Sequence, residues 1–136
     1  MTNGMYGVFT LVLLGLGIVS RNRWESDPNI TTCMLFWIST FTFWTFWWLY
    51  TRNRAVVLFF LGNISNAAAT LSNNGFMPVA GKKLASDSVW VPLTAESNLP
   101  WLCDVLPFKS SVGDWMLLAG MIVFFVLVCR KRFARW

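Results

Sequence analysis

Four apolar segments, at residues 4–20, 32–50, 55–72 and 112–129, take up about half of this chain of 136 residues. A helix needs about 20 mostly apolar residues, within a range of about 17 to 25, to cross the bilayer core of about 30 Å. Only 12% of the residues are charged, against about 25% in soluble domains. The sequence therefore predicts an all-α, polytopic membrane protein: one domain with four transmembrane helices, a long interfacial loop at 73–111 and a basic tail at 130–136.

The short polar stretches between these segments indicate how the helices are connected. Residues 21–31 and 51–54 are short enough to join antiparallel helices, and we expect both to be loops. After the third segment, Asn74-Gly75 favours a turn because both residues tolerate positive φ. Pro78 cannot continue a helix. We therefore expect the third helix to end here and the chain to leave the bilayer, with a short interfacial helix inside the loop as a further option.

The third segment carries a line of polar side chains. Spacings of three, four and three residues place them on one face of a helix. An amide in hydrocarbon is costly unless it is paired, so this face should meet another helix. It serves either for interhelical hydrogen bonding or as a polar ligand or permeation face, and its residues are Asn63, Asn66, Thr70 and Asn73.

Tryptophans gather where the segments should reach the headgroups. Such clusters are typical of an aromatic belt, and contact with a pigment, quinone or sterol is the sharper alternative. No cofactor is assigned from the sequence, and a bound lipid, pigment or quinone stays open. The interfacial aromatics are Trp44, Trp47 and Trp48 in the second segment and Trp90 and Trp101 in the loop.

At the start of the fourth segment, Ser111 and Asp114 have the spacing of a capping box. An acid in the first turn also meets the positive end of the helix dipole. A proton-relay role for Asp114 is the alternative, because acids within membrane segments are often functional. There is no His, and the three Cys occur singly, so we expect no metal site.

The charges indicate orientation and exclude one class of partner. Lys and Arg sit at segment ends rather than in a basic stripe, so we expect no nucleic-acid binding. Bases close to the spans favour the side that carries both termini as cytoplasmic, although Arg21 and Arg23 after the first segment argue the other way. In the favoured orientation Cys33 and Cys103 share the outer side, and a disulfide between them is a hypothesis.

Three motifs, in order along residues 55–129, resemble a family of small bacterial integral membrane proteins that is catalogued as a domain of unknown function. They are Asn74-Gly75-x-Met77-Pro78-Val79, the run from Leu99 through Asp104 to Pro107, and Ser111-Val-Gly113-Asp114. The first two segments match only in being hydrophobic. The resemblance implies a multi-pass protein of the bacterial inner membrane and carries no activity with it.

Three functions fit these features. The first is a non-catalytic subunit or scaffold of a larger membrane complex, photosynthetic or respiratory among others, because the chain has no His, no paired intramembrane acids and no phosphate loop. The second is a small oligomeric transporter or channel that uses the polar face of the third segment. The third is an enzyme acting on lipid, with Asp104 and Asp114 as acid and base. We expect partners to be the bilayer and other membrane subunits, and no enzymatic activity.

Overall fold

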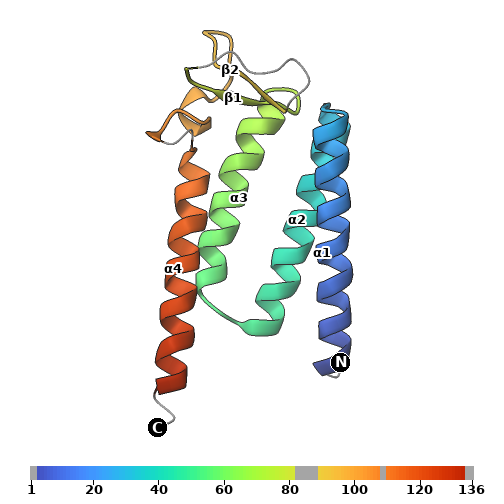
Figure 1. Ribbon diagram of the computed structural model, residues 1–136, viewed down its shortest axis with the longest axis vertical. Coiled ribbons are helices and arrows are strands. Elements are labelled where there is room, and N and C mark those ends of the chain that lie inside the picture. Colours follow the sequence, from blue (N-terminus) through green and yellow to red (C-terminus); the bar gives the residue numbers. More distant parts are fainter. Residues whose placement is uncertain (1–2, 82–88, 108–109, 134–136) are drawn as a thin grey trace.

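The computed structural model describes residues 3–81, 89–107 and 110–133, and four helices run through this part of the chain. They are α1 (Asn3–Ser26), α2 (Ile30–Thr51), α3 (Ala55–Ser72) and α4 (Val112–Phe133). They run alternately up and down, and both termini lie at the end opposite the segment that joins α3 to α4 (Figure 1). The prediction of a mostly helical protein with four helices is confirmed.

Two helix ends lie more than two residues beyond the apolar segments, and α2 begins at Ile30, two residues before its predicted start. Residues 21–26, predicted as loop, continue α1, because charged pairs one turn apart extend it: Arg21 with Glu25 at 2.6 Å and Arg23 with Asp27 at 3.6 Å. The loop prediction for 21–26 is therefore wrong. At the other end of the chain α4 continues to Phe133, four residues past the predicted end at 129. Residues 134–136 of the predicted basic tail lie outside the described residues, as do Lys82, Lys83 and Lys109.

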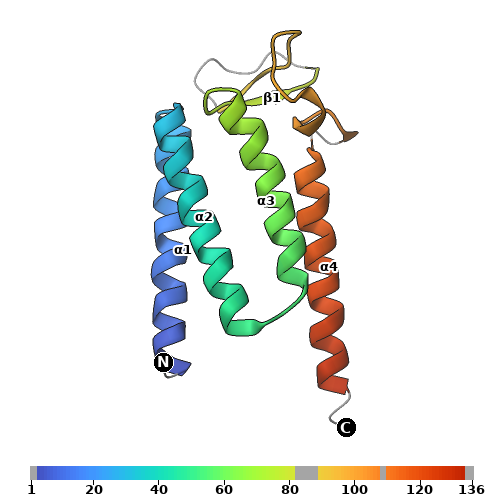
Figure 2. The ribbon, with the colours of Figure 1, turned by 180° about the vertical axis from the view of Figure 1, so that it is seen from behind.

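Glycines bring α3 close to the first part of α4 (Figure 2). A Cβ added to Gly62 of α3 would stand 2.6 Å from the carbonyl oxygen of Gly113 on α4. A Cβ on Gly120 would meet the Leu58 side chain at 3.2 Å. Small residues allow helix backbones to approach in this way. By contrast, nothing lies within 4 Å of a Cβ added to Gly15 or Gly17 on α1.

The segment between α3 and α4 forms a cap over one end of the helices. A short parallel pair joins β1 (Met77–Val79) to β2 (Trp90–Pro92), with Met77 opposite Trp90 and Val79 opposite Pro92. A 3-10 helix, η1 (Pro100–Leu102), follows. The strands were not predicted, because the sequence indicated only a loop with an interfacial helix. The turn at Asn74-Gly75 forms as expected, with φ of 57° and 91°.

Buried side chains concentrate beneath this cap. One cluster joins all of the first three helices to the cap and contains Trp24, Cys33, Trp37, Ala67 and Val89. A second lies between α3 and the cap and contains Ala69, Met77, Val79, Leu102 and Cys103. Cys33 and Cys103 thus belong to different clusters, and both are free. The hypothesis of a disulfide between them is therefore contradicted.

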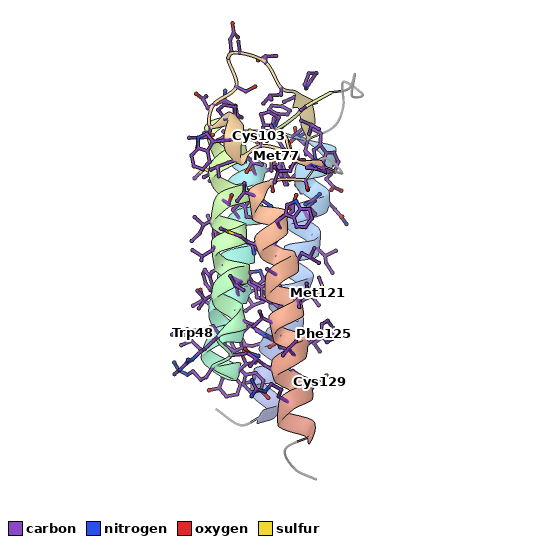
Figure 3. All side chains as sticks on the ribbon, turned by 90° about the vertical axis from the view of Figure 1, so that its left-hand side faces the viewer. Trp48, Met77, Cys103, Met121, Phe125 and Cys129 are labelled. Atoms are coloured by element: carbon purple, nitrogen blue, oxygen red, sulfur yellow. The ribbon has the colours of Figure 1, made fainter. Side chains whose placement is uncertain are left out.

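Away from the cap, the helices present apolar side chains to their surroundings. Figure 3 shows Met121, Phe125 and Cys129 along α4, and Met77 and Cys103 at the capped end. Two helices in the described part of the chain are long and apolar enough to cross a membrane: Ala55–Ser72, with mean hydropathy 1.5, and Val112–Arg130, with mean hydropathy 2.3. Membrane crossing stays a prediction for all four helices.

Candidate functional site

The start of α4 is held by a reciprocal pair of hydrogen bonds. The Ser111 backbone N–H donates to Oδ2 of Asp114 at 3.0 Å, and the Asp114 N–H donates to the Ser111 hydroxyl at 3.0 Å. This is the geometry of a capping box, in which side chains satisfy N–H groups that have no partner inside the helix. It fixes the Asp114 carboxylate at the capped end of the bundle.

Asn66 of α3 joins this cap. Its side-chain amide donates to Oδ1 of Asp114 at 2.9 Å, and its Oδ1 accepts from the Ser111 hydroxyl at 2.7 Å. Asn66 is 7% exposed and Ser111 fully buried, so these bonds satisfy groups that water does not reach. The amide of Asn66 is therefore used to hold α3 to α4.

Tryptophan side chains attach the first two helices to α3. The indole N–H of Trp37 on α2 donates to the Thr70 hydroxyl at 2.8 Å. Thr70 in turn donates to the Asn66 carbonyl of its own helix at 2.9 Å. The indole N–H of Trp24 on α1 donates to the carbonyl of Gly75 at 2.7 Å. Both indoles are buried, so α1 and α2 are each joined to α3 or to the turn after it.

The remaining two members of the polar face of α3 lie elsewhere. Asn73 exchanges hydrogen bonds with the backbone of Asn98 in the cap, donating at 2.9 Å and accepting at 2.8 Å. Asn63 is buried, but its amide donates at 2.6 Å to the carbonyl of Phe59 on its own helix. The predicted face therefore splits into Asn66 and Thr70, Asn73 at the cap, and Asn63 closer to the middle of α3.

A polar pocket of about 250 Å³ lies where α1, α2, α3 and α4 meet the cap. Every helix contributes at least one side chain, and the cap closes it with residues from β1, β2 and the stretch after η1. The lining residues are Arg21, Trp24, Trp37, Asn66, Thr70, Met77, Val89, Trp90, Asp104 and Asp114.

Asp104 is the most unusual group in this pocket. Its backbone is fixed beside β1, because its N–H donates to the Pro78 carbonyl and its carbonyl accepts from Ala80, both at 3.1 Å. Its side chain is 6% exposed, and its Oδ1 has no hydrogen-bond partner among the described residues. Burial, and then the charge of Asp114, raise the pKa of Asp104 from 3.8 to about 7.

Arg21 supplies the positive charge on the pocket wall. Its guanidinium lies over the rings of Trp24 at 5.3 Å, Phe36 at 5.5 Å and Trp90 at 5.9 Å. Its Nε donates to Glu25 at 2.6 Å. The guanidinium is thus placed by aromatic faces and a neighbouring carboxylate of α1, and it faces a pocket that holds two further carboxylates.

The structure brings six of the residues singled out from the sequence to this pocket: Asn66, Thr70, Met77, Trp90, Asp104 and Asp114. It does not bring the other four interfacial tryptophans there. Trp44 stacks on Phe59 at 4.5 Å, and Trp48 lies beside Arg52 at 5.2 Å. Trp47 stacks on Phe43 at 6.0 Å, and Trp101 is 63% exposed. Asn74, Gly75, Pro78 and Pro107 shape the backbone of the cap and do not line the pocket.

Sequence reasoning missed four lining residues: Arg21, Trp24, Trp37 and Val89. Arg21 and Trp24 were assigned to a surface loop, and helix periodicity counted from residue 21 would have placed them on one face with Glu25. Nothing local in the sequence marks Trp37 or Val89, because their roles depend on partners in other elements. Among the described residues, no group of three His, Cys, Asp or Glu side chains is arranged to hold a metal ion.

The fold and the site define a mostly helical protein of four helices with a capped polar pocket at one end. A model described as "Family of unknown function (DUF5317)" matches residues 3–126, and the chain belongs to this family. The match includes the first two helices, which the sequence motifs did not cover. Searches of curated proteins and of solved structures gave no match.

Proposed function

We propose that this protein is a four-span integral protein of the bacterial inner membrane, with both termini in the cytoplasm, and a non-catalytic subunit or scaffold of a larger membrane complex. Its apolar exterior supports the membrane assignment. Leu11 on α1 is 69% exposed and Phe125 on α4 is 59% exposed, and many apolar neighbours on both helices are also exposed. Exposed apolar area on this scale is costly in water and favourable in hydrocarbon.

The inward polar face of α3 supports a scaffold. Asn66 and Thr70 hydrogen-bond within the protein, to Asp114, Ser111 and Trp37. These polar groups therefore hold the helices together and are not turned towards lipid. This closed network is the observation on which the proposal rests, because a scaffold needs a rigid bundle and no open path.

The surface of the α1–α2 pair supports a partner subunit. Apolar grooves of about 420 Å³ and 440 Å³ flank the pair, and Leu13 lines both. Gly17 lines the second groove, and a Cβ added there would meet nothing within 4 Å. Small residues in transmembrane helices let a neighbouring helix approach closely. We assign this second groove to a transmembrane helix of a partner subunit.

Purification from native membranes in a mild detergent tests this proposal. The wild-type chain should bring down partners in fixed stoichiometry, and an absorbance spectrum of the same sample would reveal a bound pigment or quinone. Gly17→Leu should reduce partner recovery while leaving the thermal stability of the isolated chain unchanged. Recovery of the chain with lipid but without any other protein would contradict the proposal.

The second candidate is a small transporter or channel, and the polar pocket favours it. Asn66, Thr70 and Asp104 line a space that a polar solute would fit. Four helices enclose little room, so this function requires a homo-oligomer. Flux into liposomes that persists after Asn63 and Asn66 are replaced by Leu would count against a path along α3. An enzyme acting on lipid has less support, because both carboxylate oxygens of Asp114 already accept hydrogen bonds.

A further inference from the structure

The buried carboxylate of Asp104 faces a pocket without a hydrogen-bond donor for one of its oxygens. In the described part of the chain, only two buried side-chain oxygens lack a partner, Oδ1 of Asp104 and Oγ of Ser65. Ser65 does not line the pocket, whereas Asp104 does. An unpaired buried acceptor costs free energy, and a cation bound at the same carboxylate would offset this cost.

The charges around the pocket select a cationic donor. Two carboxylates, Asp104 and Asp114, face one guanidinium, that of Arg21. Arg21 is already paired with Glu25, so the acids of the pocket exceed the bases. Each carboxylate oxygen of Asp114 already accepts a hydrogen bond, one from Asn66 and one from Ser111. The free acceptor therefore belongs to Asp104, and a cation placed there would be held by two negative charges.

The volume of the pocket and its aromatic wall limit the class of ligand further. The pocket of about 250 Å³ is smaller than the roughly 300–1,000 Å³ of sites for drug-sized ligands. Trp24, Trp37 and Trp90 form part of its wall, and indole faces attract cations. We propose that this pocket binds a small primary ammonium group, whose N–H donates to the carboxylate of Asp104. The group could belong to a soluble amine or to an aminated lipid headgroup, since both share this chemistry.

The inference goes beyond the proposed function and does not depend on it. Equilibrium binding of an amine requires neither partner subunits nor flux across a membrane. If the protein is a scaffold that binds no amine, the binding test below will fail although the proposed function holds. If it binds an amine but has no partner subunit, the binding test will succeed although the proposed function fails.

The test uses the full chain purified in detergent and titrated with ethanolamine, followed by calorimetry and by the fluorescence of the pocket tryptophans. Tetramethylammonium is the matched probe, because it carries the charge but no N–H. Ethanolamine should bind saturably and tetramethylammonium at least about tenfold more weakly, the factor expected for loss of one charged hydrogen bond. Equal binding of the two cations, or no saturable response to ethanolamine, would overturn the inference.

Two variants locate the site. Asp104→Asn keeps the shape and removes the charge, and it should weaken ethanolamine binding by about tenfold or more. Glu96→Gln removes an exposed acid from the same segment and should leave binding unchanged. Binding that survives Asp104→Asn at full strength would overturn the assignment.

Proton release gives a readout on the unaltered protein. An ammonium ion pairs with ionised Asp104, so binding near neutral pH should release protons, and calorimetry in two buffers measures them. The other charged groups that face Asp104 are Arg21 of α1 and Asp114 of α4. Binding without proton release at pH 6 would contradict a role for Asp104.

Bilayer nanodiscs distinguish the two sources of the ammonium group. If the group belongs to a lipid, the tryptophan spectrum should differ between phosphatidylethanolamine and phosphatidylcholine discs, and ethanolamine should add nothing in the former. If it belongs to a soluble amine, ethanolamine should change the spectrum equally in both. Either result supports the shared chemistry, and no change in any disc would refute it.

Discussion

Asn66 on α3 donates its side-chain amide to Oδ1 of Asp114 on α4 at 2.9 Å, and these two residues are 48 positions apart in the chain. The same Asn66 accepts from Ser111, whose backbone N–H is bonded to the other oxygen of Asp114. Three side chains thus form one connected set that caps α4 and holds it to α3. Members of such a set stabilise one another, so the changes in unfolding free energy caused by replacing them should not be additive.

Replacing Asn66 by Leu should destabilise the protein by about 1–3 kcal/mol, because it leaves the buried hydroxyl of Ser111 without its acceptor. Asn63→Leu is the matched control on the same helix. Asn63 bonds only to its own backbone at Phe59, so its loss should cost less. Unfolding in a detergent titration measures both, and equal costs would contradict the network described for Asn66.

The stability of the protein should fall as pH rises from about 4 to about 8. The pKa of Asp104 is raised from 3.8 to about 7 in the folded protein. Between these values the folded state holds a proton that the unfolded state has lost, so the contribution is complete below the unfolded pKa and disappears as pH passes the folded pKa. At about 1.4 kcal/mol per pKa unit, the effect is a few kcal/mol at most.

The Asp104→Asn variant isolates this dependence. Glu25 and Asp27 pair with arginines in both proteins, so their own pH effects cancel when the two unfolding curves are compared. The difference between wild type and variant should shrink as the pH is lowered from 8 to 4. A difference that does not change over this range would show that Asp104 titrates normally.

A methyl group added to Gly62 should separate α3 from α4. Its carbon would stand 2.6 Å from the Gly113 carbonyl, and backbone on both sides cannot yield cheaply. We expect Gly62→Ala to cost about 1–3 kcal/mol through overpacking. Gly17→Ala on α1 meets nothing within 4 Å and should be neutral or stabilising by up to about 1 kcal/mol. Thermal unfolding of the two variants should move in opposite directions or differ clearly.

Trp37→Phe should destabilise the protein by about 1 kcal/mol, because it removes the donor to the Thr70 hydroxyl while keeping an aromatic ring. Trp101 is 63% exposed, so Trp101→Phe should have little effect. Chemical unfolding, with the loss of helix signal as the measure, compares them directly. If Trp101→Phe destabilises the protein as much as Trp37→Phe does, the hydrogen bond of Trp37 does not join α2 to α3 as described.

Cysteine labelling tests the four-span arrangement and its orientation. Ser97 belongs to the segment between α3 and α4, and Asn53 to the turn between α2 and α3. These two connections lie at opposite ends of the helices (Figure 1). On a background without Cys129, a membrane-impermeant maleimide should label Ser97→Cys in intact spheroplasts and label Asn53→Cys only after permeabilisation. The reverse labelling pattern would show the opposite orientation. Labelling of both cysteines from outside would contradict the four-span arrangement.

The sequence predicted helix ends correctly where neighbouring residues in the chain determine them. The bounds of α3 coincide with the third apolar segment, because a stretch without charged residues or proline is followed at once by turn chemistry at Asn74-Gly75. The end of α1 was missed because hydropathy falls at Arg21, whereas the helix continues through ion pairs between residues four apart. Hydropathy reports on solvent preference and does not report on helix propensity.

The site was predictable only in part. Asn66, Asp104 and Asp114 stood out as polar groups in apolar or loop surroundings, which one sequence reveals. The parallel pairing of β1 with β2 joins Met77 to Trp90 across a long connection, and no local signal specifies it. The same holds for Trp37, which reaches the pocket only because α2 packs on α3.

The long-range partnership of Asn66 has a consequence for biosynthesis. Its hydroxyl partner, Ser111, comes 45 residues later in the chain, so the nascent polypeptide must hold α3 with an unpaired amide until α4 emerges from the ribosome. A fragment that stops before Ser111 keeps that exposed amide permanently. Such a fragment should be degraded faster than the full chain by the proteases that clear incomplete polypeptides.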